Sequence, residues 1–447
     1  MAERMRRSEV VGKGTVVAAA LTCFGVAAMA LAGAREGASV AQVVVYCVIP
    51  VLSGAALLAA LRLIDGTRIN LLLALLSTGV TLYAAELTLG YYFERANVGR
   101  RAAGAAWDDR TRIQVAQDLR RAGADAYPRL SGWDLRQLRL TIDGRAVQPL
   151  APSVAGALVV LCRETDEYIT YVADERGFNN PKGGWLGESD AVILGDSYVH
   201  GYCVPEAESL AHLLRRRWPT LLNLGVAGTG PLMQLAVLKE YAAVKRPRTV
   251  IWVYYEGNDL SDMEAEEISP ILARYLRPGF TQGLLSDQEL VDARLASRVA
   301  EMIVELGEDA HGFSGGTRFA TRAREALTLR VLRSLAGIGA RFPRRGSSLG
   351  HLPAILREAK RTVESWGGEL HLVYLPTSSR YGSWFGEVVR GRPELLQTAA
   401  ALGLPVIDLE PSFRATGEAR QLWVPGGHLR TRGNAIVAER ILAEIPR

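Results

Sequence analysis

The chain has 447 residues, which is more than one ordinary domain contains. Its 49% hydrophobic and 22% charged residues are typical of globular proteins and exclude a disordered chain, a collagen-like repeat and a small disulfide scaffold. The net charge is only +5 and the basic residues are scattered, so we expect no nucleic acid as a partner. The four cysteines form neither a CxxC pair nor a zinc-spaced cluster with histidine, and no metal or cofactor is predicted.

The first 95 residues contain three long apolar runs, at 14–33, 40–61 and 71–92. A helix of about 20 apolar residues spans roughly 30 Å, the thickness of the hydrocarbon core of a bilayer. Basic residues precede the first run and flank the link between the other two, at Arg62 and Arg68, which indicates that both segments are cytoplasmic. We therefore predict a multi-pass inner-membrane protein with three transmembrane helices, an all-α membrane region in contact with the lipid bilayer. The remainder would face the periplasm or the outside. Signal-peptidase cleavage after the first run would leave two spans and the same orientation.

From residue 190 onward, strand-like and helical patterns alternate, which predicts a parallel sheet covered by helices on both faces. The predicted strands are 191–194, 221–224, 249–255, 369–375 and 404–407. The predicted helices are 206–217, 231–244, 352–366, 394–402 and 433–445. Between the third and fourth strands, residues 260–350 are too many for a connection and predict a helical insertion or lid.

Residues 96–189 connect the apolar region to this α/β region. They are polar at first and then strand-like around 138–161 and 168–173, which indicates a stalk followed by a small β-rich accessory region. We therefore divide the chain into a membrane domain at 1–95, the accessory region at 96–189 and an α/β domain at 190–447.

The loops that follow the predicted strands carry the residues of an acyl-transfer site. Ligands of an open parallel sheet bind beyond the carboxyl ends of the strands. Ser197 follows the first strand at a strand-to-helix turn, where its hydroxyl could act as a nucleophile if a base took its proton. His428, just before the last helix, is the best-placed base. We interpret the other five histidines as structural: His200, His212, His311, His351 and His371.

The oxyanion of a tetrahedral intermediate requires two or three fixed hydrogen-bond donors. The backbone amides of Ser197 and Gly228 and the side-chain amide of Asn258 are the predicted donors. Glycine at 228 lets the backbone approach closely, and asparagine at 258 supplies N–H groups without charge. We interpret Asp196 and Asp259, in the same loops, as carboxylates that stabilise their turns.

These residues resemble the sequence blocks of the SGNH (GDSL-like) hydrolases. The blocks read Ala-Val-Ile-Leu-Gly-Asp-Ser at 191–197, Asn-Leu-Gly-Val-Ala-Gly at 223–228, Glu-Gly-Asn-Asp at 256–259 and Gly-His-Leu-Arg-Thr-Arg-Gly-Asn at 427–434. The resemblance to a membrane-anchored member of this family implies a three-layer α/β/α, flavodoxin-like domain with a five-stranded parallel sheet. It also implies that Ser197 and His428 are catalytic.

One part of the family pattern is missing. Family members usually carry an Asp three residues before the catalytic His, where this chain has Pro425. The nearest acids are Asp408, which we take as the candidate that orients the imidazole, and Glu410. Otherwise a backbone carbonyl must orient His428, and the site would be a dyad.

Three functions are compatible with these residues. The first is a membrane-anchored serine esterase or deacylase that acts outside the cytoplasm on an O-acylated glycan, a lipid or another envelope ester. The second is an O-acyltransferase in exopolysaccharide or cell-envelope modification, working with other polysaccharide-assembly proteins. The third is a binding or scaffold subunit of low activity, for which the missing Asp is the main support.

Two of the four cysteines, Cys162 and Cys203, lie in the part of the chain predicted to be outside, where thiols can oxidise. We predict that they form a disulfide, which would link the accessory strands to the loop that carries Ser197. The alternative is a pair of buried thiols, because connectivity does not follow from sequence alone.

Overall fold

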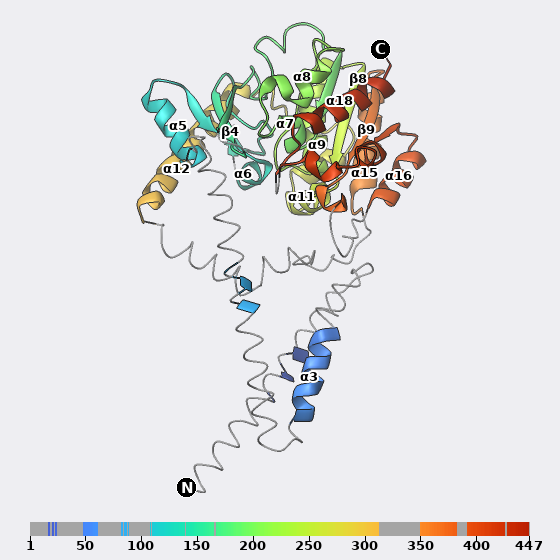
Figure 1. Ribbon diagram of the computed structural model, residues 1–447. Helices are drawn as coiled ribbons and strands as arrows, with labels where there is room; N and C mark the ends of the chain where they lie inside the picture. The colour runs from blue at the N-terminus through green and yellow to red at the C-terminus, as the bar shows by residue number, and fades with distance from the viewer. Residues whose placement is uncertain are drawn as a thin grey trace. The chain divides into compact units, whose positions relative to one another are not determined.

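The computed structural model describes residues 108, 110–138, 140–164, 167–312, 349–381, 391–424 and 427–446, and scattered residues between 17 and 88 (Figure 1). The chain divides into two compact units. One comprises Met1–Ala103, Phe313–Ser347 and Gly382–Val388, and the other comprises Gly104–Gly312, Ser348–Tyr381 and Val389–Arg447.

In the first unit the structure describes one complete helix, α3 (Ile49–Ala60), which lies within the second predicted span. Ala20 and Leu57 are buried against each other, with Cys23 and Phe24 beside them. Of the residues described, none belongs to a helix that is both long and apolar enough to cross a bilayer. The predicted spans at 14–33, 40–61 and 71–92 lie mostly outside the described residues and stay a prediction.

The second unit is built on a five-stranded sheet in which every pair of neighbours is parallel. The strands are β6 (Ala191–Leu194), β7 (Leu222–Asn223), β8 (Thr249–Tyr255), β9 (Glu369–Leu375) and β10 (Val406–Asp408). Their spatial order is β10-β9-β8-β6-β7. This is the flavodoxin-like order, with the first strand beside the second and third. The predicted five-stranded parallel sheet is confirmed.

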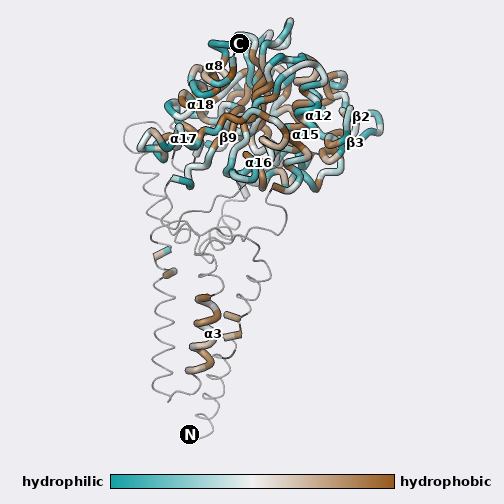
Figure 2. Tube along the Cα trace, turned by 90° about the vertical axis from the view of Figure 1, so that its right-hand side faces the viewer, coloured by the Kyte–Doolittle hydropathy of each residue, from teal (hydrophilic) through white to brown (hydrophobic). Residues whose placement is uncertain are grey.

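Side chains of successive strand residues point to opposite faces of this sheet and enter two separate cores. In β8, Val250, Trp252 and Tyr254 lie in one core, whereas Ile251 and Val253 lie in the other. Helices cover both faces, which gives the predicted three α/β/α layers (Figure 1). The hydropathy colouring in Figure 2 shows apolar residues gathered on β9 and the elements around it.

The first core is covered by α9 (Pro231–Val237), α12 (Gln288–Gly312), α15 (Leu352–Glu364) and α16 (Arg392–Ala401). The second is covered by α8 (Leu210–Leu214), α17 (Glu410–Arg414) and α18 (Thr431–Glu444). The remaining helical segments of the α/β region are α7 (Ser197–His200), η2 (Glu206–Glu208), η3 (Leu238–Ala242), α10 (Ala243–Lys245), α11 (Asp259–Glu266), η4 (Leu272–Leu276), η5 (Ser378–Tyr381) and η6 (Ala419–Leu422). Within the insertion predicted at 260–350, the described residues 260–312 contain most of α11, η4 and α12, joined by turns at 267–271 and 277–287.

The accessory region contains a mixed three-stranded sheet of β1 (Ala126–Pro128), β4 (Leu158–Cys162) and β5 (Ile169–Val172). A hairpin of β2 (Leu140–Ile142) and β3 (Arg145–Val147) and the helices α5 (Arg112–Arg121) and α6 (Gly132–Gln137) complete it. Some of its apolar side chains, including Leu135, Ile142 and Val147, belong to the same core as β6, β7 and α9, whereas those of α5 and the end of β4 form two smaller clusters. The accessory strands are therefore fixed relative to the large sheet, and part of the predicted stalk is the helix α5.

The double-sided core predicts how truncations of leucine depend on position. Leu235 in α9 is fully buried, whereas Leu290 in α12 is 49% exposed. We expect Leu235→Ala to lower the free energy of unfolding by about 2–5 kcal/mol, because it removes buried methyl groups and leaves a cavity. Leu290→Ala should change it by about 0.5 kcal/mol or less. Denaturant unfolding of the full-length protein measures both, and equal losses would contradict the assigned layers.

Candidate active site

The site lies at the carboxyl ends of β6 and β8, where the strand order reverses direction. Chain connections leave these two neighbouring strands toward opposite sides of the sheet, which opens a crevice between them. Ser197 begins α7 directly after β6, and Asn258 lies between β8 and α11. The topology therefore explains why residues from separate sequence blocks meet here.

A tight turn between β6 and α7 presents the hydroxyl of Ser197. Asp196 is the N-cap of α7, and its carboxylate accepts a hydrogen bond of 3.0 Å from the backbone N–H of Tyr198. A Cβ on Gly195 would lie 2.8 Å from the backbone oxygen of Val253, so only glycine lets the turn pass this close to β8. Asp196 is completely buried, so the turn excludes water from its carboxylate. This burial raises the pKa of Asp196.

The predicted nucleophile and base meet. The Oγ of Ser197 lies 2.7 Å from Nε2 of His428, although the two residues are 231 positions apart. The rings of Tyr198 and Tyr202 flank the imidazole, with centroids 4.9 Å and 4.4 Å from its own. A second contact of the Ser197 hydroxyl, with the carboxylate of Asp196, is longer at 3.2 Å. The hydroxyl therefore makes its shorter hydrogen bond with the base.

Glu164 orients the imidazole of His428. One carboxylate oxygen lies 2.6 Å from Nδ1 of His428, and the other accepts a hydrogen bond of 2.9 Å from its backbone N–H. An ionised carboxylate only accepts hydrogen bonds, so Nδ1 carries the proton. Nε2 is then free to accept the proton of Ser197, as a general base must.

The role that we predicted for Asp408 is wrong. Its carboxylate pairs with Arg392 and accepts a hydrogen bond of 3.0 Å from the backbone N–H of Glu410. Glu164, from the accessory region, occupies the position beside Nδ1 of His428 instead. The site is a Ser-His-Glu triad rather than a dyad.

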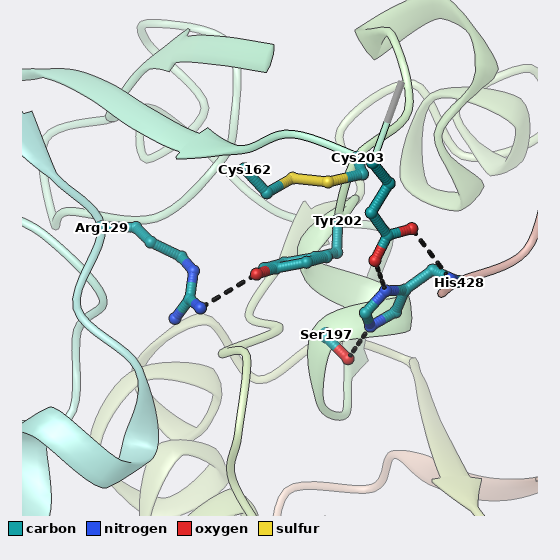
Figure 3. The surroundings of a disulfide bond; sticks show 7 residues. Arg129, Cys162, Ser197, Tyr202, Cys203 and His428 are labelled. Atoms are coloured by element: carbon teal, nitrogen blue, oxygen red, sulfur yellow. Dashed lines mark hydrogen bonds and ion pairs between the residues drawn. A yellow bond between two sulfur atoms is a disulfide. The ribbon is translucent and has the colours of Figure 1, made fainter. Parts of the chain in front are cut away.

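Two features of the chain allow Glu164 to reach His428. Cys162, at the end of β4, forms the predicted disulfide with Cys203, which follows Ser197 by six residues (Figure 3). This covalent link holds the chain around residue 164 next to the nucleophile loop. A Cβ on Gly427 would lie 2.5 Å from a carboxylate oxygen of Glu164, so glycine before His428 leaves the space that the carboxylate needs.

The loop with Gly228 supplies a predicted oxyanion donor. Gly228 has a φ of 74°, a backbone conformation that favours glycine. Both the N–H and the carbonyl oxygen of its neighbour Ala227 form hydrogen bonds. The N–H of Ala227 donates to Nδ1 of His200 at 3.2 Å, and its oxygen accepts from the N–H of Gly132 at 2.8 Å. Within the described ranges, no acceptor is bonded to the backbone N–H of Ser197 or of Gly228. Both donors remain available for a developing negative charge.

Asn258, the third predicted donor, contacts the next turn of its own helix. Its Nδ2 donates a hydrogen bond of 2.8 Å to the carboxylate of Asp262, which leaves the second N–H of that amide to act on a ligand. Asp262 thus fixes the rotation of the side chain. The three predicted donors therefore come from three separate loops.

His200 is structural, as predicted. It is fully buried, and its Nε2 lies 3.0 Å from the hydroxyl of Tyr171. Burial, together with the charge of Arg129, lowers the pKa of His200 to about 3, so the ring is neutral. Its Nδ1 is consequently an acceptor that holds the loop of Gly228 in place. In the described part of the chain, no group of His, Cys, Asp and Glu side chains forms a metal site.

Comparisons with known proteins give limited information about this chain. No protein-family model and no curated protein matches it. Among solved structures, it is similar to a member of the lipolytic G-D-S-L family from Veillonella parvula, with 14% identity, a TM-score of 0.32 and coverage of 57% of this chain and 98% of that one. The YXIM protein of Bacillus subtilis is similar at 12% identity and a TM-score of 0.31, over 58% of this chain and 56% of its own. At these identities and TM-scores, only the geometry of the site itself indicates its chemistry.

The Cys162–Cys203 disulfide predicts a specific pattern of alkylation. In the denatured but unreduced full-length protein, iodoacetamide should modify neither cysteine, because neither has a free thiol. Reduction before alkylation should expose both, as peptide mass analysis would show. The free thiol of Cys23 is an internal positive control in both samples. Alkylation of Cys162 or Cys203 without reductant would contradict the bond.

Proposed function

We propose that the protein is a membrane-anchored serine esterase that removes acyl groups from an O-acylated glycan or a similar envelope ester outside the cytoplasm. The observation that carries the proposal is the unbroken hydrogen-bonded series Ser197–His428–Glu164, with distances of 2.7 Å and 2.6 Å. A serine hydroxyl, a neutral imidazole and a carboxylate in this order form the relay that activates serine toward carbonyl carbon.

In the first half of the reaction, Oγ of Ser197 attacks the ester carbonyl carbon while Nε2 of His428 takes its proton. The imidazolium that forms is stabilised by the carboxylate of Glu164. The negative charge on the former carbonyl oxygen is met by N–H groups of Ser197, Gly228 and Asn258. When the tetrahedral intermediate collapses, the C–O bond to the alcohol breaks and Nε2 returns the proton to the leaving alcohol.

The second half of the reaction releases the acyl group from Ser197. His428 takes a proton from water, whose oxygen attacks the acyl-enzyme, and Nε2 then returns a proton to Oγ of Ser197. The products are a carboxylic acid and free enzyme. A glycan hydroxyl in place of water would give O-acyl transfer by the same steps, so incubation with acceptor glycan and mass analysis separates transfer from hydrolysis.

Glu164 also bears on the proposal of a scaffold subunit with little activity. That hypothesis depended on the missing Asp before His428. Since a carboxylate from another part of the chain binds Nδ1 of His428, the missing Asp no longer argues against catalysis. We therefore favour an enzyme over a scaffold.

Two observations support a position outside the cytoplasm. The three apolar runs of the first 95 residues are long enough to span a bilayer, and the basic residues around them favour an outward orientation for the rest. The disulfide between Cys162 and Cys203 is also typical of oxidising compartments. Both are compatible with an envelope ester as the substrate.

The triad predicts different effects for two carboxylates. With p-nitrophenyl acetate as substrate, we expect Glu164→Gln in the full-length protein to lower kcat by roughly 10²–10⁴-fold, because the imidazole loses the acceptor that sets its tautomer. Asp408→Asn should change kcat by about twofold or less, since Asp408 pairs with Arg392 away from the imidazole. Ser197→Ala and His428→Ala define the background rate. Equal rates for these two variants and wild type would overturn the proposed function, and a larger effect of Asp408→Asn would overturn the triad.

If Asn258 is an oxyanion donor, its removal should lower kcat, the rate of the chemical step. Asn258→Ala should lower kcat for the same ester by about 10²–10³-fold, the usual effect of removing one such donor. Ser261→Ala is the matched control, because Ser261 lies in the same turn and, among the described residues, its hydroxyl bonds only to the backbone oxygen of Asn258. If both substitutions reduce kcat equally, Asn258 acts by stabilising the turn rather than by binding the oxyanion.

A further inference from the structure

A cavity of about 340 Å³ lies where α5, the end of β4 and the segment after α7 meet. Its lining residues include Arg112, Arg163, Tyr168 and Tyr202. We call it the arginine cavity. Its volume is at the small end of the range for ligand pockets, suited to one sugar unit or a smaller group.

The arginine cavity is next to the triad. Tyr202 lines the cavity on one side, and its ring centroid lies 4.4 Å from that of His428 on the other. Arg129 reaches the same tyrosine, where Nη2 donates a hydrogen bond of 3.0 Å to the phenolic oxygen (Figure 3). Cys162 and Arg163 line the cavity, and Glu164 follows them directly in the chain. A ligand in the cavity would therefore lie within one residue's width of the reacting atoms.

Two arginines at this site, Arg112 and Arg129, have buried guanidinium nitrogens that lack an acceptor in the described ranges. Nε of Arg112 and Nε and Nη1 of Arg129 are buried without a hydrogen-bond partner. No ion pair joins either arginine to a carboxylate in the described ranges. Asp134, whose charge acts on Arg112, is already hydrogen-bonded by the hydroxyl and the N–H of Ser131.

A buried guanidinium N–H group without an acceptor is unfavourable, because it has lost water without gaining a hydrogen bond. Burial, and then the charge of Arg129, lowers the pKa of Arg112. An anion in the cavity would supply an acceptor for Arg112 and offset the repulsion between Arg112 and Arg129. Guanidinium groups bind carboxylate and phosphate through two parallel hydrogen bonds, which gives such a site specificity as well as affinity.

We propose that the arginine cavity binds an anionic group of the substrate, a uronate carboxylate or a sugar phosphate carried by the glycan whose ester reacts at Ser197. This inference rests on the proposed function and names its substrate class. Arg112 and Arg163, which line the cavity, hold the anion, and Arg129, bonded to Tyr202, adds positive charge beside it. Tyr202 separates the anion from the imidazole of His428. The enzyme thereby selects esters on charged glycans over esters on neutral ones.

The test compares three substrates that differ only at C6, which carries a hydroxyl, is a carboxylate or carries a phosphate. They are methyl glucoside, methyl glucuronoside and methyl glucoside 6-phosphate, each O-acetylated on its ring hydroxyls, and acetate release is measured with the full-length protein. We expect a lower KM for the charged esters, and the two charged probes distinguish carboxylate from phosphate. In Arg112→Gln and Arg129→Gln, the ratio of kcat/KM for charged to neutral ester should fall by about 10- to 100-fold, since a hydrogen bond to a charged group is lost.

Arg121→Gln is the matched control. Arg121 is an exposed residue at the other end of α5 and pairs only with Asp118 in the described ranges, so its loss should leave the ratio unchanged. Arg112→Lys should keep part of the selectivity, because it retains charge without the planar fork. A ratio that does not respond to the Gln substitutions, or responds equally to Arg121→Gln, would overturn the proposal.

A binding measurement keeps this test independent of catalysis. Calorimetry with Ser197→Ala should detect methyl glucuronoside or methyl glucoside 6-phosphate, with binding that weakens as salt increases, and should detect neutral methyl glucoside at least about 10-fold more weakly. If wild type cleaves none of the esters but this binding preference is present, the esterase proposal fails and the anion site stands. If the esters are cleaved but no charged sugar binds preferentially, the anion site alone is wrong.

Discussion

The two-point contact between the carboxylate of Glu164 and His428 is the interaction on which the site depends. One oxygen fixes the protonated nitrogen of the ring, and the other fixes the backbone of the same residue. The imidazole can therefore neither rotate nor adopt the tautomer that would present a proton to Ser197. The contact joins residues 264 positions apart and connects an accessory segment to the last loop of the α/β fold. The disulfide at Cys162 and the missing side chain of Gly427 are the two conditions that make it possible.

Buried acids, which are unfavourable for stability, hold the site rigid. Asp196, Asp259 and Glu266 are completely buried. Burial raises the pKa of each, to about 8 for Glu266, and outweighs the backbone N–H groups that favour the charged form. Glu266 accepts hydrogen bonds from the N–H groups of Gly230 and Met233 at the start of α9, and Asp259 accepts one from Tyr255. These acids hold the loops that carry the predicted oxyanion donors, so groups unfavourable for stability maintain the geometry of the site.

Tyr202 lies between the catalytic triad and the proposed anion-binding site. Its ring lies beside the imidazole, its hydroxyl accepts a hydrogen bond from Arg129, and the residue itself lines the arginine cavity. Because Cys203 follows it and is bonded to Cys162, the tyrosine has little freedom to move. A substrate anion and the reacting ester would thus be held at a fixed separation, which is the condition for binding energy at one end to favour reaction at the other.

The sequence by itself determined the elements and two members of the triad. Alternating apolar runs and helical periodicity located all five strands of the large sheet, because both patterns are local. The motif residues Ser197 and His428 could be assigned because loops after parallel strands converge on one edge. The pairing of Cys162 with Cys203 was also predicted. Because Glu164 lies only two positions after Cys162, that pairing could have indicated that Glu164 lies near the loop of Ser197.

Only the tertiary structure decided which acid orients His428. Asp408 is closer than Glu164 to His428 in the sequence, but its carboxylate pairs with Arg392 at the end of β10. The packing of the accessory strands on the large sheet instead brings Glu164 to the imidazole of His428. The arginine cavity has the same origin, because its lining residues Arg112, Arg163 and Tyr202 come from separate segments with no shared periodicity. Contacts between distant segments depend on how whole elements pack, and local patterns of residues do not encode that packing.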